Sequence, residues 1–104
     1  MITKKREGSL MKLQFLHMGT LVGYYLSPLQ FHVTNVFVLP EWRNQGIATA
    51  LFQRLFYELK KNHVHTVTLD DCSDTGRCYQ KLGFQYVKEG YPEMRFDLFT
   101  NKHE

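Results

Sequence analysis

The first forty residues alternate between apolar and polar side chains over short distances. In residues 11–15, Met, Leu and Phe are separated by Lys and Gln, which is the two-residue period of a strand with one buried face. A turn signal, Met-Gly-Thr, separates this segment from the apolar residues 21–26, so the two segments predict an antiparallel hairpin. Residues 31–39 follow a Ser-Pro break and predict a third strand that is more deeply buried.

From Gly46 the apolar positions recur every three or four residues, which is the period of a helix. The positions four apart are Ile47, Leu51, Leu55 and Leu59. Lys60 and Lys61 lie near the end of this pattern, where the helix dipole favours cations. The pattern therefore predicts a helix over 46–62 that stops with Asn62 in the left-handed conformation.

The remainder of the chain predicts three more strands and one short helix. Residues 65–70 alternate and are rich in β-branched side chains, so they predict a strand. Residues 75–82 predict a short helix closed by Gly83, a residue favoured just after a helix. Residues 84–87 and 94–98 predict the last two strands.

The predicted order is β-β-β-α-β-α-β-β, in which the long helix and its two neighbouring strands make a βαβ crossover. We expect an α+β fold with a mixed, mostly antiparallel sheet, in a single domain that spans residues 1–104. The polar ends, 1–9 and 99–104, are expected to be frayed. The basic run Lys4-Lys5-Arg6 is expected to be a solvated tail.

Composition excludes several classes of function. A net charge of +3 favours an anionic ligand, but it falls short of the basic surface of a nucleic-acid-binding protein. Residues 10–26 contain too many polar side chains to span a membrane. Cys72 and Cys78 match neither a disulfide framework nor a zinc pattern. We therefore expect no metal, and a reducing, cytoplasmic compartment.

Residues 36–51 carry the first chemical motif, at a junction of strand, turn and helix. Pro40 ends the strand because it cannot donate to a ladder, and Arg43-Asn-Gln-Gly-Ile-Ala48 gives R-x-x-G-x-A at the helix start. The first N–H groups of a helix have no intrahelical partner and lie at the positive end of the dipole, which suits a phosphate group. Small residues that only permit close packing explain this motif equally well when it is taken alone.

A second motif, Tyr79-Gln-Lys-Leu-Gly-Phe84, follows on the far side of the predicted βαβ unit. Together the two motifs resemble those of the GNAT superfamily of acyl-CoA-dependent N-acetyltransferases. The first is similar to the family's pyrophosphate-binding segment, and the second to its Y-x-K-x-G-F junction between helix and strand. The resemblance covers residues 11–98.

This resemblance implies a site for acetyl-CoA, the acyl donor, in a wedge between the strands 31–39 and 65–70. The arm of the donor would pair with the edge of the first strand, and its pyrophosphate would lie on the N–H groups of residues 44–49. The implied donor-binding residues are Phe37, Val38, Leu39, Arg43, Asn44, Gln45, Gly46, Ile47, Ala48, Thr49 and Ser73. A surface salt bridge is an equally good explanation for Arg43.

The resemblance also implies that Tyr79 donates a proton to the leaving thiolate. A phenol with a pKa of about 10 is matched to a thiol with a pKa of about 8.5, although the ring of Tyr79 could instead only pack the short helix on the sheet. No general base stands out. Asp70 and Asp71 suit a turn equally well, His32 suits packing, and a water relay would need no base at all.

The chain departs from the family at two places. The family usually opens with a strand and two helices that cover the acceptor side, and few residues precede the first predicted strand here. The acceptor site is therefore expected to be open, or completed by a partner subunit in a homodimer, or covered by a large acceptor. Cys72 stands where the family often has Asn, so Ser73 or the backbone is expected to replace its contact with the donor.

Three functions compete on this basis. The first is an N-acetyltransferase that moves an acetyl group from acetyl-CoA to a primary amine of a small molecule or a protein. The second is a GNAT-like module that binds CoA without turnover, and the third is a small binding protein whose basic tail contacts an acidic partner or nucleic acid. A rise in melting temperature with acetyl-CoA excludes the third, and release of CoA in the presence of amines separates the first from the second.

Overall fold

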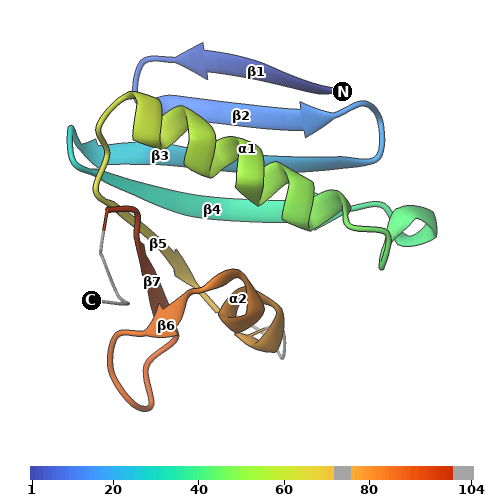
Figure 1. The fold of residues 1–104 in the computed structure, drawn as a ribbon. Coiled ribbons are helices and arrows are strands. Elements are labelled where there is room, and N and C mark those ends of the chain that lie inside the picture. Colours follow the sequence, from blue (N-terminus) through green and yellow to red (C-terminus); the bar gives the residue numbers. More distant parts are fainter. Residues whose placement is uncertain (72–75, 100–104) are drawn as a thin grey trace.

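The computed structural model describes residues 1–71 and 76–99, which form a seven-stranded sheet with helices on it (Figure 1). The elements are β1 (Ile2–Glu7), β2 (Leu10–Phe15), β3 (Gly19–Ser27), β4 (Gln30–Val38), the 3-10 turn η1 (Pro40–Trp42), α1 (Ile47–Lys61), β5 (Thr66–Asp70), α2 (Gly76–Leu82), β6 (Gln85–Tyr86) and β7 (Glu93–Asp97). The α+β fold predicted from the sequence is confirmed, with one more strand at its N-terminal end.

The strands lie in the order β1-β2-β3-β4-β5-β7-β6. β4 and β5 are parallel and are connected through α1, whereas all other neighbours in the sheet are antiparallel. The predicted βαβ crossover is therefore confirmed. It joins an N-terminal meander of four strands to a C-terminal group of three.

Both α-helices cover the same face of the sheet. α1 lies across β2, β3 and β4 (Figure 1) and buries Leu51, Leu55 and Leu59 completely. α2 packs beside α1, with the ring of Tyr79 edge-on to that of Phe52 at 5.9 Å between centroids. The opposite face of the sheet carries no helix in the described part of the chain.

The N-terminal segment is a strand, so the prediction that residues 1–9 are frayed was wrong. β1 pairs with β2 along its whole length, and Gly8 and Ser9 close the hairpin. Gly8 has a φ of 61°, a left-handed conformation that glycine adopts without steric cost. This connection of two residues leaves no room for a helix between β1 and β2.

The basic run Lys4-Lys5-Arg6 belongs to β1 and is not a solvated tail. Lys4 Nζ lies 2.9 Å from Glu58 Oε1, and the guanidinium of Arg6 lies 4.2 Å from the centroid of the Tyr25 ring. The prediction failed because three successive cations hide the alternation of a strand. The charged ends of Lys4 and Arg6 nevertheless reach partners on α1 and β3.

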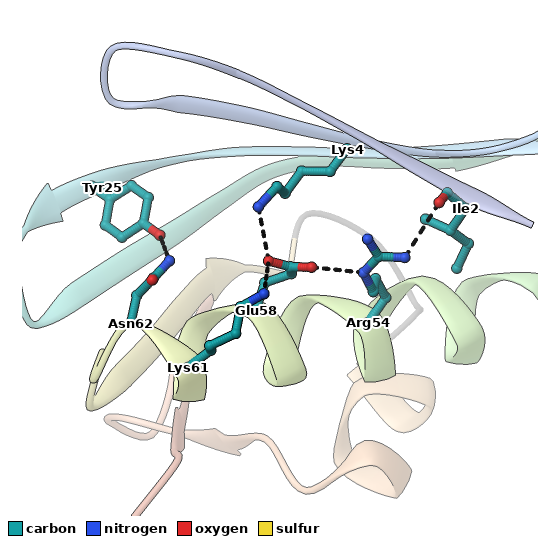
Figure 2. Close-up of polar contacts among 7 residues, drawn as sticks. All are labelled: Ile2, Lys4, Tyr25, Arg54, Glu58, Lys61 and Asn62. Atoms are coloured by element: carbon teal, nitrogen blue, oxygen red, sulfur yellow. Dashed lines mark hydrogen bonds and ion pairs between the residues drawn. The ribbon is translucent and has the colours of Figure 1, made fainter.

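Glu58 is the buried anion that ties β1 to α1 (Figure 2). Its side chain is 3% exposed, and its carboxylate contacts Lys4 Nζ and Arg54 Nε, each at 2.9 Å, and Lys61 Nζ at 3.5 Å. Arg54 also donates to the carbonyl of Ile2 at 3.3 Å. Burial alone would raise the pKa of Glu58, but the hydrogen bonds and charges of these cations outweigh it and lower the pKa from 4.5 to about 2.

α1 ends in a Schellman motif whose left-handed residue is His63. The N–H of Val64 donates to the carbonyl of Leu59 at 2.9 Å, and the N–H of His63 donates to the carbonyl of Lys60 at 3.0 Å, which is the bond pair of this motif. His63 has a φ of 62°, whereas Asn62 has a φ of −97°. The left-handed position predicted from the sequence was therefore one residue too early.

β4 separates from β5 halfway along its length. The two strands stop pairing after Val33 and Leu69, while β4 continues to Val38. At the same point the register of β4 against β3 skips Thr34, whose hydroxyl donates to the carbonyl of Val22 at 3.0 Å. An extra residue in one strand of a pair bends that strand and increases its twist, which accounts for the separation.

The last three predicted strands are observed as β5, β6 and β7 with slightly shifted ends, and α2 is observed over Gly76–Leu82. Residue 75, where the short helix was predicted to begin, lies outside the described residues, as does the predicted frayed end 99–104 beyond Phe99. Neither α-helix of the described ranges has the length and apolarity needed to cross a bilayer.

Replacing Glu58 with Gln is expected to lower the free energy of unfolding by about 2–3 kcal/mol at pH 7, because a carboxyl pKa held below its unfolded value stabilises the fold at higher pH. The stabilisation is fully present above about pH 4.5 and is lost as the pH falls through about 2, the folded pKa. Urea unfolding of both proteins at pH 7, 4 and 3 measures the difference.

Glu89→Gln is the matched control, because Glu89 is exposed in the turn before β7. It is expected to leave the unfolding curve unchanged at every pH. The same pH dependence in both variants would contradict the role assigned to Glu58.

His63→Gly is expected to raise the free energy of unfolding by about 0.5–1 kcal/mol, because glycine adopts the left-handed conformation without the clash of a Cβ. Asn62→Gly is expected to lower it by about the same amount, because Asn62 has a negative φ and glycine only adds freedom to the unfolded chain. Thermal unfolding of the two variants measures both changes. Shifts in the same direction would contradict the assignment of His63 as the left-handed residue.

Candidate active site

A cleft of about 590 Å³ lies where β4 has left β5, between the end of β4, the start of α1 and α2. Its lining residues are Val36, Phe37, Val38, Trp42, Arg43, Asn44, Gly46, Ile47, Ala48, Thr49, Phe52, Cys78, Tyr79 and Leu82. The cleft therefore brings together the two sequence motifs, which the whole βαβ crossover separates in the chain.

The start of α1 presents unpaired N–H groups at this cleft. The first helical hydrogen bond runs from the N–H of Ala50 to the carbonyl of Gly46 at 2.9 Å, so the N–H groups of residues 47–49 precede the helical ladder. Gly46 has a φ of 81°, and a Cβ built on it would meet no atom within 4 Å. Glycine is thus required here by the backbone conformation and not by packing. The open space beside unpaired N–H groups fits a phosphate group.

Arg43 lies along the mouth of the cleft and contacts β4. Its Nε donates to the carbonyl of Val38 at 2.8 Å, and its guanidinium lies 5.6 Å from the centroid of the Phe37 ring. In the described part of the chain Arg43 forms no ion pair of the kind proposed as its alternative role. Since Nε is engaged, the two terminal nitrogens are the donors that could meet an anion at the start of α1.

The outer edge of β4 presents backbone polar groups to the cleft. The N–H of Leu39 donates to the carbonyl of Met18 at 2.9 Å, so Leu39 directs its backbone toward the β3 side. The direction of the backbone N–H and C=O groups alternates along an antiparallel ladder. Those of Phe37 therefore also point to β3, and those of Val36 and Val38 point away from it. Beyond Val33 no described strand pairs with that edge.

The second motif forms a Schellman motif at the end of α2. The N–H of Phe84 donates to the carbonyl of Tyr79, and the N–H of Gly83 to that of Gln80, both at 3.0 Å. Gly83 has a φ of 113°, as the left-handed position of the motif requires. The half-buried ring of Tyr79 packs edge-on to Phe84 and Phe52. Tyr79 therefore both packs against the core and lines the cleft.

Most of the donor-site residues singled out in the sequence line the cleft, but Leu39 and Gln45 do not. Leu39 faces β3, and Gln45 Nε2 lies 3.4 Å from the carbonyl of Glu41 on the outside of the turn. Ser73, like Cys72, lies outside the described residues. The lining residues that the sequence did not indicate are Val36, Trp42, Phe52, Cys78 and Leu82. Of these, the position of Val36 could have been inferred from Val38 by the two-residue period of a strand. The position of Leu82 could have been inferred from Tyr79 by the three-residue spacing of neighbours on a helix face.

The side chains considered as general bases do not line the cleft. Asp71 accepts a hydrogen bond from the hydroxyl of Tyr86 at 2.6 Å, and this bond is the main cause of a raised pKa at Tyr86. Asp70 Oδ2 lies 3.9 Å from Nε2 of His32. Within residues 1–71 and 76–99 no cluster of three His, Cys, Asp or Glu side chains is placed to hold a metal ion.

The protein family is shown by a direct match. The family model of the acetyltransferase (GNAT) domain matches residues 3–98, so the chain belongs to the GNAT acetyltransferase family, as its two motifs indicated. Acetyl-CoA is the acyl donor of this family. No curated protein matches the chain significantly.

Solved structures share the fold at low sequence identity. Ard1 from Thermoplasma volcanium is 19% identical, with a TM-score of 0.71 over 88% of this chain and 72% of that protein. Tetrahymena GCN5 is 13% identical, with a TM-score of 0.77 over 88% and 70%. A GNAT family acetyltransferase from Elizabethkingia anophelis, solved with acetyl-CoA bound, is 19% identical, with a TM-score of 0.69 over 85% and 74%. At such identities the likeness establishes the fold.

Gly46→Ala is expected to weaken binding of acetyl-CoA at least tenfold, because a Cβ would hold a phosphate away from the N–H groups, each worth about 1.5–3 kcal/mol to a charged acceptor. The variant should also lose about 1 kcal/mol of stability, since alanine at positive φ is strained. Calorimetric titration with acetyl-CoA measures the affinity.

Gly8→Ala is the matched control, because Gly8 also has a positive φ and open space around it but lies in the β1–β2 turn. It should lose a similar amount of stability and keep the affinity for acetyl-CoA. An equal loss of affinity in both variants would show that the effect of Gly46 is strain and not contact.

Proposed function

We propose that the chain is an N-acetyltransferase that moves an acetyl group from acetyl-CoA to a primary amine of a small molecule or a protein. One observation carries the proposal: the cleft at the separation of β4 and β5 is lined both by the start of α1 at Gly46, where unpaired N–H groups fit a phosphate, and by Tyr79. The first suits the diphosphate of the donor, and the second suits its leaving sulfur.

In this proposal the diphosphate lies on the N–H groups from Asn44 to Thr49, and the terminal nitrogens of Arg43 reach it from the mouth of the cleft. The amide-containing arm runs along the outer edge of β4, where the backbone groups of Val36 and the N–H of Val38 can bond to it as an added strand would. The carbonyl of Val38 already accepts from Arg43. Phe37 and Ile47 line the walls. Leu39 and Gln45 shape the turn, and Ser73 belongs to the set on sequence grounds alone.

Tyr79 acts on the sulfur in this scheme. When the amine attacks the thioester carbon, the carbon–sulfur bond breaks and the sulfur needs a proton to leave as a thiol. A phenol supplies that proton readily, because its pKa of about 10 is only slightly above that of a thiol, about 8.5. The edge-on packing against Phe52 and Phe84 holds the ring in place, so the hydroxyl needs little reorganisation.

The proposal describes the acceptor by its chemical class, a primary amine. A homodimer that completes the acceptor site, and an acceptor large enough to cover it, are both compatible with a sheet face that carries no helix in the described part of the chain. Cys78 is an exposed free thiol, which fits the reducing, cytoplasmic compartment that we include in the proposal.

Tyr79→Phe is expected to slow turnover by roughly 10²–10⁴-fold, because it removes the proton donor. The affinity for acetyl-CoA should stay unchanged, because the ring and its packing remain. Release of CoA from acetyl-CoA over a panel of primary amines measures turnover. Tyr57→Phe is the control, because Tyr57 is 60% exposed on α1 away from the cleft.

An unchanged rate in Tyr79→Phe would remove Tyr79 from the mechanism. A rise in melting temperature with acetyl-CoA, without release of CoA in the presence of any amine, would make the chain a CoA-binding module instead of an enzyme. No thermal shift at millimolar acetyl-CoA would contradict both functions.

A further inference from the structure

Two lysines are direct neighbours on the sheet face opposite α1. Lys5 of β1 and Lys12 of β2 are partners in the antiparallel ladder, and both are exposed. Met11 and Leu13, on either side of Lys12, are buried in the core, so both lysines point away from the helices. In residues 1–71 and 76–99 neither lysine forms an ion pair. Since like charges directly opposite each other destabilise a ladder, this pair is unfavourable in an isolated chain.

Two carboxylates are direct neighbours on the same face, at the far side of the sheet. Asp70 of β5 is the ladder partner of Glu93 of β7, and both residues are exposed. Leu69 and Met94, which adjoin them in their strands, are buried in the core, so the carboxylates also point away from the helices. This second pair of like charges has the opposite sign to the first.

The register of the sheet places both pairs in one row. Successive partners from β2 to β7 form a buried row on the helix side: Met11, Gly23, Val33, Leu69 and Met94. The next ladder position along each strand, past the bulge at Thr34 on β4, lies on the other face. It holds the residues that we call the charged row: Lys5, Lys12, Val22, Asn35, Asp70 and Glu93. The row therefore has two cations on β1 and β2, two uncharged side chains on β3 and β4, and two anions on β5 and β7.

The other charges of this face do not cancel the charged row. Arg95 is held by Asp97 at 3.1 Å, so this couple adds no net charge on β7. Glu7 of β1 lies opposite Leu10, and one anion leaves an excess of positive charge beside the two lysines. In the described part of the chain, the β1–β2 side of the face is therefore positive, and the β5–β7 side is negative.

Uncharged side chains occupy the centre of this face. Val22 and Tyr24 of β3 are half-buried, and Leu10, the ladder partner of Tyr24, is 50% exposed. Removing apolar surface from water contributes about 25 cal/mol for each Å². The centre can therefore supply affinity for a partner, while the charged ends fix the orientation of that partner.

We propose that this face packs on the same face of a second copy of the chain, about a two-fold axis that runs parallel to the strands between β3 and β4. The rotation lays β1 and β2 of one protomer over β5 and β7 of its partner. Lys5 and Lys12 of one protomer then meet Asp70 and Glu93 of the other, and the symmetry makes this contact twice. The charged row is self-complementary, because its cations, neutral side chains and anions lie over the same series in reverse order.

A second copy fits this face better than a partner of one charge does. Asp70 and Glu93 would repel a polyanion, and Lys5 and Lys12 would repel a polycation. Two sheets of the same twist pack face to face with their strands nearly aligned, about 10 Å apart. Side chains as long as lysine and glutamate span that gap together. The inference concerns association alone and does not rest on the acetyltransferase function.

Sedimentation velocity over a range of protein concentrations tests this arrangement, at low salt where exposed charges are least screened. The wild-type protein is expected to reach twice the mass of one chain as its concentration rises. Lys5→Glu with Lys12→Glu places anions against anions at both ends of the contact, and it is expected to weaken dimerisation at least about 100-fold. Asp70→Lys with Glu93→Lys places cations against cations, and the same loss is expected.

Mixing the two variants is the decisive step. The first carries anions at both ends of the charged row, and the second carries cations at both ends. The mixture is therefore expected to form a heterodimer, although neither variant forms a homodimer alone. Lys60→Glu with Lys88→Glu is the control, because it changes the net charge equally at exposed positions of α1 and of the turn between β6 and β7. It should dimerise as the wild type does.

Three results would overturn the proposal. They are a wild-type protein that stays monomeric up to millimolar concentration, a dimer that persists in both charge-reversed variants, and a mixture that fails to associate although circular dichroism shows both variants folded. If either variant fails to fold, Lys5→Gln with Lys12→Gln decides, because it removes the attraction without reversing it. An unchanged dissociation constant in that variant overturns the inference, and a weaker dimer supports it.

Discussion

The separation of β4 from β5 is the constraint on which the rest of this structure depends. The two strands share only a short parallel ladder, which ends after Val33 and Leu69, and the extra residue Thr34 bends β4 away. Because β5 leaves, the outer edge of β4 keeps unpaired backbone groups, and a cleft forms that α1 and α2 wall. If the pairing of β4 and β5 continued past this point, both the cleft and the free edge would be absent. No cavity would then open beside the start of α1.

The same local conformations serve both the fold and the site. The left-handed glycine at the start of α1 leaves the first N–H groups of the helix open toward the cleft. The left-handed glycine at the end of α2 closes a Schellman motif whose carbonyl acceptor is Tyr79. Part of each motif is therefore explained by helix geometry alone. A helix end does not explain the phenol of Tyr79 or the open space beside Gly46, and the proposed chemistry depends on these two features.

The sequence predicted the long helix well, because the four-residue spacing from Ile47 to Leu59 is a strong signal that does not depend on distant residues. It failed at β1, whose strand character comes from pairing with β2 and from the anion of Glu58, 54 residues further along the chain. The bulge at Thr34 has no local signal, because threonine is an ordinary strand residue. The contact of Arg43 with Val38 likewise has no signal in the neighbouring sequence. The helix-start and Tyr79 parts of the cleft were indicated by motifs, whereas the places of Trp42 and Phe52 in its wall depend on how the elements pack in the fold.

The basic residues of β1 have a consequence for how copies of this chain can associate. β1 is the first strand in the order of the sheet, so its outer edge presents unpaired N–H and C=O groups that could pair with another strand. If two copies met there in antiparallel fashion, Lys4-Lys5-Arg6 of one would lie opposite the same run of the other. Like charges that face each other across a ladder are destabilising. The sheet therefore resists extension at this edge, and aggregation through the strands is disfavoured where the hydrogen-bonding groups are most accessible.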